Sequence, residues 1–153
     1  MNGGRLITPT FLRRSSVAGF LVSKQVVKPK TSRQMRELMR LNVVRGTGKK
    51  ANIPGYRVGG KTGTGEKVVN GKYNDKFLLN TFLSAFPTDA PQYVMLVMID
   101  EPKATKKTFG YATAGWNAAP TTGNIIKRIA PMLGVLPRGE QINPFGDPVM
   151  VSY

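Results

Sequence analysis

The sequence predicts a single α/β domain of the α+β type, with an antiparallel sheet of about three main strands and flanking helices. Residues 31–45 and 117–134 repeat apolar residues at helical spacing, which predicts two helices. Between them, residues 56–73, 77–86 and 93–99 are rich in β-branched and aromatic residues, which favour strands. A length of 153 residues with 41% apolar residues is typical of one globular domain.

The first predicted helix follows 30 irregular residues. In that N-terminal region, short apolar clusters are broken by glycine, proline and basic residues. This pattern predicts loops and short strands that pack against another part of the protein. Thr31 and Gln34 then have the spacing of a capping box. The apolar face of this helix comprises Met35, Leu38, Met39 and Val43. We expect the helix to end near Arg45, where Gly46 can supply a left-handed cap.

The central segment predicts an antiparallel meander. The run from Tyr56 to Thr64 favours a strand, and the Asn70-Gly71 pair after it suits a type I′ hairpin turn. The next two segments, Phe77–Phe86 and Tyr93–Ile99, are apolar at adjacent as well as alternate positions. This pattern is typical of strands that are covered on both faces.

The second helix is expected to start near Asn117, with Pro120 tolerated in its first turn. Its apolar face comprises Ile125, Ile126, Ile129, Met132 and Leu133. The run Pro131–Gly134 is expected to end it. The proline-containing segment 135–153 resembles an extended tail.

The composition excludes several kinds of chemistry. Without cysteine or histidine, the chain has no disulfides, no thiolate nucleophile, no Ser-His-Asp triad and no ordinary zinc site. We expect no cofactor and no metal ion. No apolar run approaches the ~20 residues that span a bilayer, and Met1–Arg5 lacks a signal peptide's apolar region. We therefore expect no targeting or membrane segment in the chain itself.

The charge is +15 and is concentrated in the first 50 residues, which hold 12 basic residues and one acidic residue. Such a bias can mark a nucleic-acid surface. However, no basic helix with interleaved aromatic residues is present. Arg33, Arg36 and Arg40 fall on one stripe opposite Met35 and Met39, which is typical of a solvated helix face. We therefore do not expect nucleic-acid binding.

The run Lys61-Thr62-Gly63-Thr64 is the one constellation that suggests a site. On an edge strand, Thr62 and Thr64 would point to the same side and offer two hydroxyl donors to a carboxylate. Lys61 adds a positive charge, and Gly63 allows another element to approach the backbone closely. A backbone N–H at such an edge can stabilise an oxyanion. Taken alone, a Lys-Thr-Gly tripeptide is more often part of a turn.

The surroundings of this run carry a family resemblance. The segment Gly55–Lys67 resembles the third motif of the class B penicillin-binding transpeptidases, and within that class the septal cell-division enzymes. The similarity runs from about Asn2 to about Pro137. Other segments that resemble the family are Thr31–Met39, Gly46–Ala51, Ala85–Pro87, Ile99–Pro102 and Gly115–Pro120.

The resemblance implies a partial penicillin-binding, serine β-lactamase-like fold. The family's motifs are Ser-x-x-Lys, Ser-x-Asn and Lys-Thr-Gly, in that order. No serine of this chain has lysine three positions later or asparagine two positions later, so the first two motifs are absent. Residues 1–137 are therefore expected to be the C-terminal part of a transpeptidase domain, and residues 138–153 an extended tail.

The resemblance also implies roles for the matched residues. Lys61 would be the catalytic residue in the cleft, while Thr62, Gly63 and Thr64 would bind the carboxylate of a peptidoglycan stem peptide or β-lactam. The Thr64 N–H would form half of an oxyanion hole. The parent would cross-link stem peptides by acyl transfer from D-Ala-D-Ala on the periplasmic side of the inner membrane, with division-site membrane proteins as partners. Without the missing N-terminal half of the domain, this chain is expected to be inert.

Other interpretations of the same residues remain open. The chain can instead be a non-catalytic basic binding or structural module of the cell envelope. Tyr111 and Trp116 can line a ligand groove or simply pack, and Glu66 and Asp100-Glu101 are most simply solvated charges. We also expect the strand Tyr93–Ile99 to have a bare edge. That edge would favour self-association or be covered by residues 1–30 or 135–153.

Overall fold

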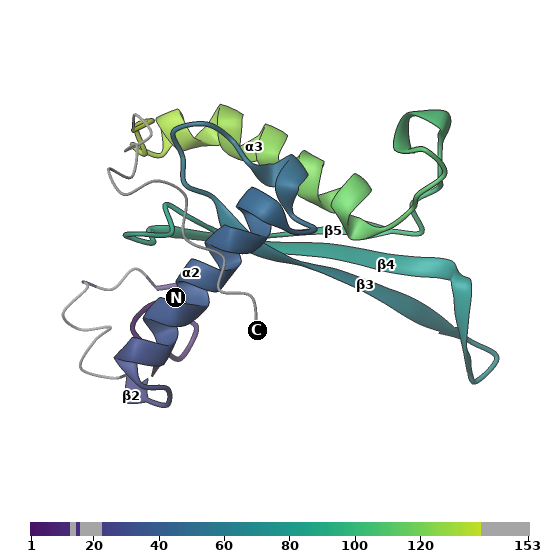
Figure 1. The fold of residues 1–153 in the computed structure, drawn as a ribbon. Helices are drawn as coiled ribbons and strands as arrows, with labels where there is room; N and C mark the ends of the chain where they lie inside the picture. The colour runs from purple at the N-terminus through teal and green to yellow at the C-terminus, as the bar shows by residue number, and fades with distance from the viewer. Residues whose placement is uncertain (13–14, 16–22, 139–153) are drawn as a thin grey trace, which may run out of the picture.

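The computed structural model describes residues 1–12, 15 and 23–138. A three-stranded antiparallel sheet in the order β3-β4-β5 lies at its centre, with helix α3 along one face and helix α2 across one end (Figure 1). The bounds of the main elements are α2 Pro29–Arg45, β3 Gly59–Val69, β4 Lys72–Phe86, β5 Tyr93–Asp100 and α3 Ala118–Met132. The predicted fold class, an antiparallel sheet of three main strands with flanking helices, is confirmed.

The strands form the expected meander, and the hairpin turn lies where the sequence predicts it. Asn70 and Gly71 both have positive φ, 52° and 78°, as a type I′ turn requires. The strand before the turn is longer than expected, because β3 continues from the glycine-rich run to Val69. Strand β4 is likewise one continuous strand of 15 residues.

The core lies between the sheet and helix α3. Phe82 and Phe86 of β4, Val58 before β3, and Ile126 of α3 are at most 1% exposed. Helix α3 begins after Asn117, as predicted, and the Asn117 side chain accepts a hydrogen bond from the Ala118 N–H. The buried stripe of α3 is made mostly of small residues, which lets the helix lie close to its neighbours: Ala118, Ala119, Thr122, Gly123, Ile126 and Ala130.

The prediction that the last two strands are covered on both faces is wrong for β5. Exposed and half-buried residues alternate strictly along this strand. Val94, Leu96 and Met98 are 53–62% exposed, whereas the four residues between and beside them pack on the core: Tyr93, Met95, Val97 and Ile99. Within the described residues, α3 covers one face of the sheet, and the other face is covered only at the end near Gly59 and Ala85, where the backbone of helix α2 passes close to Gly59.

Both predicted ends of helix α2 also need correction. The helix begins at Pro29, two residues before Thr31, since proline has the required φ and needs no N–H partner in the first turn. No side chain caps its N-terminus. Gly46 is extended, with φ −103°, so it is not a left-handed cap. A glycine is needed there because a Cβ would collide with Asn42.

The chain ends behave differently from one another. The N-terminal region forms the small two-stranded sheet of β1 (Arg5–Leu6) and β2 (Lys24–Gln25), in agreement with the expected short strands. At the other end, Val135 is 3% exposed within the core. The Arg138 N–H donates to the Gly55 carbonyl oxygen at 2.9 Å, so residues 135–138 are packed rather than tail-like. The remainder of the predicted tail, 139–153, lies outside the described residues.

The edge of β5 has no strand partner beyond β4 within the described residues. The expected covering by the chain ends is absent for the parts that are described, since β1 and β2 pair only with each other and residues 135–138 lie beside Gly55. Whether two copies associate through this edge stays a prediction.

Candidate functional site

The run Lys61–Thr64 lies in β3, which is an edge strand of the three-stranded sheet. Thr62 pairs with Phe82, and Thr64 pairs with Asn80. Because directly opposed residues share a face, both threonines lie on the side of the sheet that carries the core and α3. The sequence prediction of a shared threonine face on an edge strand therefore agrees with the geometry.

Thr62 is joined to the loop after helix α2. Its hydroxyl oxygen is 2.8 Å from that of Thr47. The side-chain oxygen of Asn42 accepts from the Thr47 N–H at 3.1 Å and lies 3.2 Å from the Thr47 hydroxyl. The Asn42 amide nitrogen donates to the Gly60 carbonyl oxygen at 2.8 Å. Asn42 therefore links the end of the helix, the loop and the strand that carries Thr62.

Thr64 is joined to the other loop that borders the site. Its hydroxyl oxygen accepts from the Ala114 N–H at 3.1 Å. Asn80, directly opposite Thr64, is fully buried, and its amide donates to the Ala112 carbonyl and to the Asn117 side chain. These bonds fix the loop before α3 against the sheet. The two threonines are thus held by two different loops.

Lys61 lies beside the threonines although its Cβ points to the other face, where Leu83 is its cross-strand partner. Its Nζ donates to the Thr62 carbonyl oxygen at 2.7 Å and lies 3.4 Å from the Thr62 hydroxyl. A long side chain can bend around β3 in this way because, in the part of the chain that the structure describes, no strand pairs with the outer edge of β3. Lys61 is exposed, so it is available to an anionic ligand at that edge.

The glycines of this strand differ in the space that surrounds them. A Cβ on Gly60 would lie 2.5 Å from the Leu83 carbonyl oxygen and 2.7 Å from a ring carbon of Phe82. A Cβ on Gly63 would lie 2.5 Å from the Thr81 hydroxyl. In contrast, the nearest atom to a Cβ on Gly65 would be 3.8 Å away. Gly60 is therefore a steric requirement of the strand pair, because its close neighbour is a backbone atom, whereas the only close atom at Gly63 is a side-chain hydroxyl that can rotate away.

An open groove of about 640 Å³ begins at the site and continues along the hairpin. Gly63 and Thr64 line one end of it, and Lys67 and Val68 line the other. Lys67 donates to Glu101 at 2.8 Å and to Asp100 at 3.0 Å. These hydrogen bonds, first that to Glu101 and then that to Asp100, raise the pKa of Lys67 above its ordinary value. Asp100 and Glu101 are therefore ion-paired rather than simply solvated.

An aromatic cluster flanks the segment Ala112–Ala114, which holds Thr64. The ring centroids of Tyr111 and Trp116 are 5.3 Å apart in a stacked arrangement, and Phe109 meets Trp116 edge-on at 5.5 Å. The Lys50 Nζ lies 3.9 Å from the centroid of the Trp116 ring, a cation–π contact. The aromatic residues therefore pack on one another, and Tyr111 remains 54% exposed.

Sequence reasoning found Lys61, Thr62, Gly63 and Thr64 but missed the residues that hold them. Asn42 and Thr47 come from the end of α2 and its following loop, and Ala114 contributes a backbone N–H that no side-chain pattern reveals. The glycines on both sides of Thr47 were the one available signal. Their close contacts show that this loop packs tightly against the fold, since Gly48 approaches the Phe82 ring.

Residues 1–12, 15 and 23–138 contain no group of three or more carboxylate, histidine or cysteine side chains placed to bind a metal ion. Within the same ranges, no helix combines the length and apolar character needed to cross a bilayer.

Comparison with known proteins identifies the family. The family model of the penicillin-binding protein transpeptidase domain matches residues 1–127. The chain is 40% identical to the probable peptidoglycan D,D-transpeptidase FtsI of Caulobacter vibrioides, over 97% of this chain and 26% of that protein. It is 41% identical to the stage V sporulation protein D of Bacillus subtilis, over 93% of this chain and 23% of that protein.

Solved structures give the same result. The transpeptidase domain of Burkholderia pseudomallei penicillin-binding protein 3 aligns with a TM-score of 0.73 and 30% identity, over 89% of this chain and 40% of that one. Penicillin-binding protein 3 of Mycobacterium tuberculosis, solved with ampicillin, aligns with a TM-score of 0.67 and 30% identity, over 80% and 28% of the two chains. The chain spans about a quarter of the length of the curated relatives it matches. It belongs to the penicillin-binding protein transpeptidase family, in its class B branch.

Proposed function

We propose that this chain is the C-terminal part of a class B D,D-transpeptidase domain and supplies the strand that binds the substrate carboxylate. The observation that carries the proposal is the placement of Thr62, Thr64 and the Lys61 ammonium group along the open edge of β3. Two hydroxyl donors and one positive charge at a strand edge suit a carboxylate ligand. The relatives named as peptidoglycan D,D-transpeptidases support the same assignment.

In the complete domain, strand β3 would take part in an acyl-transfer reaction. A serine hydroxyl from the missing half would attack the carbonyl carbon of the penultimate D-Ala, and the terminal D-Ala would leave with a proton on its amine. An acceptor amine would then replace the serine oxygen and complete the cross-link. In this chain, Thr62 and Thr64 would hold the terminal carboxylate, and the Thr64 N–H would bind the developing oxyanion.

Lys61 has a separate proposed role. In the complete domain it would lie near the serine of Ser-x-Asn and help to keep the site positive, so that substrate and transition state are both stabilised. Because the chain contains no Ser-x-x-Lys and no Ser-x-Asn sequence, we propose that it forms no acyl-enzyme by itself. The parent protein would work on the periplasmic side of the inner membrane with division-site membrane proteins.

A non-catalytic envelope-binding module is the second candidate. The observation in its favour is the net charge of +15, which suits anionic cell-envelope polymers, together with the missing nucleophile. This candidate predicts that the chain works without the other half of a transpeptidase domain. The first candidate predicts that the chain gains activity only when that half is supplied.

A split-domain experiment separates the two. The chain is mixed with the preceding part of the transpeptidase domain of Caulobacter FtsI, treated with fluorescent penicillin, and analysed by intact mass. The transpeptidase proposal expects no adduct on this chain alone and one adduct, on the serine of the added half, in the mixture. Thr64→Val should reduce the rate of adduct formation by about 10²-fold or more, as loss of a site donor does.

Thr121→Val is the matched control, because Thr121 lies on α3 and its side chain makes no polar contact with the described residues. It should leave the labelling rate unchanged. A stoichiometric adduct on a serine of this chain alone would contradict the proposal, as would an equal rate for Thr64→Val and Thr121→Val in a mixture that labels.

A further inference from the structure

A basic cleft lies at the end of the sheet beside helix α2, away from the threonine site. It is a hollow of about 630 Å³ between α2 and the turn that joins β4 to β5. Five arginines line it, namely Arg33, Arg36, Arg40, Arg45 and Arg57. The carboxylates of its lining are Glu37 and Asp89, so positive charge predominates. We call this hollow the arginine cleft.

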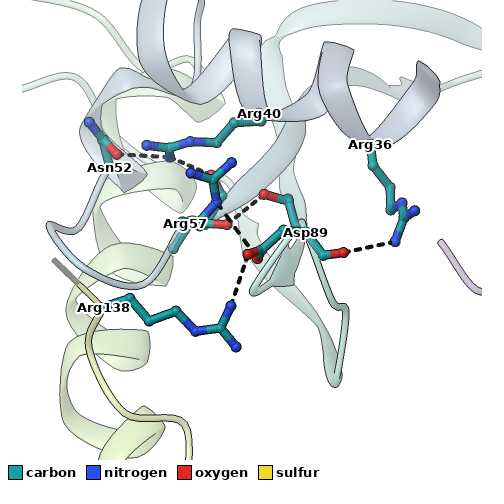
Figure 2. A network of polar contacts seen from close by, with 8 residues as sticks. Arg36, Arg40, Asn52, Arg57, Asp89 and Arg138 are labelled. Carbon is teal, nitrogen blue, oxygen red and sulfur yellow. Dashed lines mark hydrogen bonds and ion pairs between the residues drawn. The ribbon is translucent and has the colours of Figure 1, made fainter. Parts of the chain in front are cut away.

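Part of the arginine cleft is fixed in place by internal contacts (Figure 2). Arg40 donates to the Asn52 side chain at 2.9 Å and to the Val58 carbonyl oxygen at 2.8 Å. Asp89 is paired with Arg138 at 2.9 Å and with Arg57 at 3.6 Å. The negative charge of Asp89 is therefore shared by two guanidinium groups and cannot neutralise the whole cleft.

Two other guanidinium groups have donors to spare. Arg36 makes one long contact, from Nη1 to the Asp89 carbonyl oxygen at 3.4 Å, and its Nε is buried without a partner among the described residues. Arg33 makes no polar contact within the described part of the chain. The Nε is covered by the protein, so the Nη groups, which make only that one long contact, are the Arg36 donors that an oxygen-rich ligand in the cleft would meet.

The backbone at Arg57 is also unusual. Arg57 has a φ of 44°, in the left-handed region that residues other than glycine rarely adopt. Its carbonyl oxygen accepts from both the N–H and the hydroxyl of Thr88, at 3.0 and 2.8 Å. Strained backbone of this kind clusters at active sites, ligand clamps and switch regions. Here the strained residue lines the cleft, and its guanidinium is paired with Asp89 at 3.6 Å.

We propose that the arginine cleft binds the phosphate group of a ligand, with Arg36 and Arg33 as its principal donors. A phosphate is preferred to a carboxylate because it carries up to two negative charges and three acceptor oxygens, and several guanidinium groups meet here. Leu41 and Val44 are 44% and 41% exposed and form an apolar wall of the same cleft. The phosphate should therefore be attached to an apolar group.

Calorimetric titration of the full chain near neutral pH at low salt tests the proposal, with phenyl phosphate and inorganic phosphate as the probes. Phenyl phosphate should saturate one site and bind more tightly than inorganic phosphate. Arg36→Gln and Arg33→Gln should each weaken it about tenfold, which is the effect of losing one charge-assisted contact. Arg36→Lys should also weaken binding, because lysine keeps the charge but lacks the planar fork.

Arg128→Gln is the matched control, since Arg128 is exposed on α3 and carries no polar contact with the described residues. It changes the net charge by the same amount and should shift affinity less than about twofold. Co-sedimentation with phosphatidylglycerol vesicles, against phosphatidylcholine vesicles alone, identifies the source of the phosphate. Arg36-dependent sedimentation with the anionic vesicles assigns it to a lipid headgroup, and phenyl phosphate binding without sedimentation assigns it to a soluble ligand.

Two results would overturn the proposal. One is the absence of saturable phenyl phosphate binding to a chain whose thermal unfolding is cooperative. The other is equal weakening by Arg36→Gln and Arg128→Gln together with unchanged binding by Arg36→Lys, because a diffuse positive field depends on net charge alone and a built site does not.

Discussion

The hydroxyl oxygens of Thr47 and Thr62 lie 2.8 Å apart, although the two residues belong to a loop and a strand separated by 15 positions in the chain. Asn42 accepts from the Thr47 backbone and donates to the strand, so one helix residue sets both ends of this contact. The hydroxyl of Thr62 is thereby held in one orientation before any ligand arrives. Such preorganisation is what a carboxylate-binding threonine needs.

Replacing Thr47 by valine removes the hydrogen bond but keeps the shape of the side chain. We expect the free energy of unfolding to fall by about 0.5–1 kcal/mol, since the pair is solvent-accessible. Urea unfolding followed by circular dichroism measures the change. In the split-domain assay, the same substitution should slow penicillin labelling more than Thr121→Val does, because the Thr62 hydroxyl is no longer oriented. Equal labelling rates would mean that Thr47 does not position Thr62.

Asn42→Ala should lower the free energy of unfolding more than Thr47→Val does. It leaves the half-buried Gly60 carbonyl oxygen and the Thr47 N–H without their partners, a cost of about 1–3 kcal/mol. Asn124→Ala on the exposed face of α3 is the control and should change stability little. Denaturant midpoints of the two variants, measured together, decide the matter; similar midpoints would contradict the structural role assigned to Asn42.

Gly60→Ala tests the steric requirement in β3. The new methyl group would meet the Leu83 carbonyl oxygen, which belongs to the partner strand and cannot move without breaking the ladder. We expect a loss of about 3 kcal/mol in the free energy of unfolding, which is a large fraction of the stability of an ordinary domain. Gly65→Ala adds the same methyl group where the nearest atom is 3.8 Å away, and should be tolerated. Thermal melts of both variants are the measurement, and equal midpoints would show that the contact at Gly60 relaxes.

The open face and edge of β5 predict self-association of the isolated chain. Exposed Leu96 and Met98 form an apolar surface beside unpaired backbone groups, which favours strand pairing between copies. Sedimentation velocity should therefore show concentration-dependent oligomers. Met98→Lys should shift the population toward monomer, whereas Met132→Lys, an exposed site on α3, should not. A monomer at all concentrations would show that the bare edge is tolerated.

The Lys67 ion pairs predict a specific pH dependence. Because the folded state raises the pKa of Lys67 above the ordinary 10.5, the stabilisation is fully present below that pH and is lost as the pH rises through the folded pKa. Lys67→Gln should therefore be less stable than the unaltered chain at neutral pH, and this difference should shrink above pH 10.5. Paired urea titrations at several alkaline pH values measure it. A difference that grows with pH would contradict the assignment.

The sequence predicted those features of the fold that depend on local pattern. The Asn70-Gly71 turn and the start of α3 at Asn117 each have a strong local signal, and both are confirmed. The run of apolar residues in β5 predicts the wrong burial, because Leu96 and Met98 are as apolar as core residues yet face away from α3. Periodicity identifies a strand but does not reveal which neighbours cover it.

The candidate site was predictable only as far as its own strand. The period of two placed Thr62 and Thr64 on one face, and the family resemblance drew attention to them. Their partners Thr47 and Ala114 could not be found in this way, because they are brought in by loops whose course depends on tertiary packing. Arg57 was missed for a related reason, since its φ of 44° has no counterpart in residue type.

The hairpin of β3 and β4 extends beyond the helices that cover the rest of the sheet (Figure 1). Its pairing shifts register between Glu66 and Lys67. The inner part of the hairpin, up to Glu66, is therefore paired in one register and the outer part, from Lys67 on, in another. That irregularity separates the outer turn at Asn70-Gly71 from the strand segment that carries Thr64. The outer turn should therefore tolerate insertions and changes of length. An epitope or a fluorophore placed there should leave the geometry at the threonines unaltered.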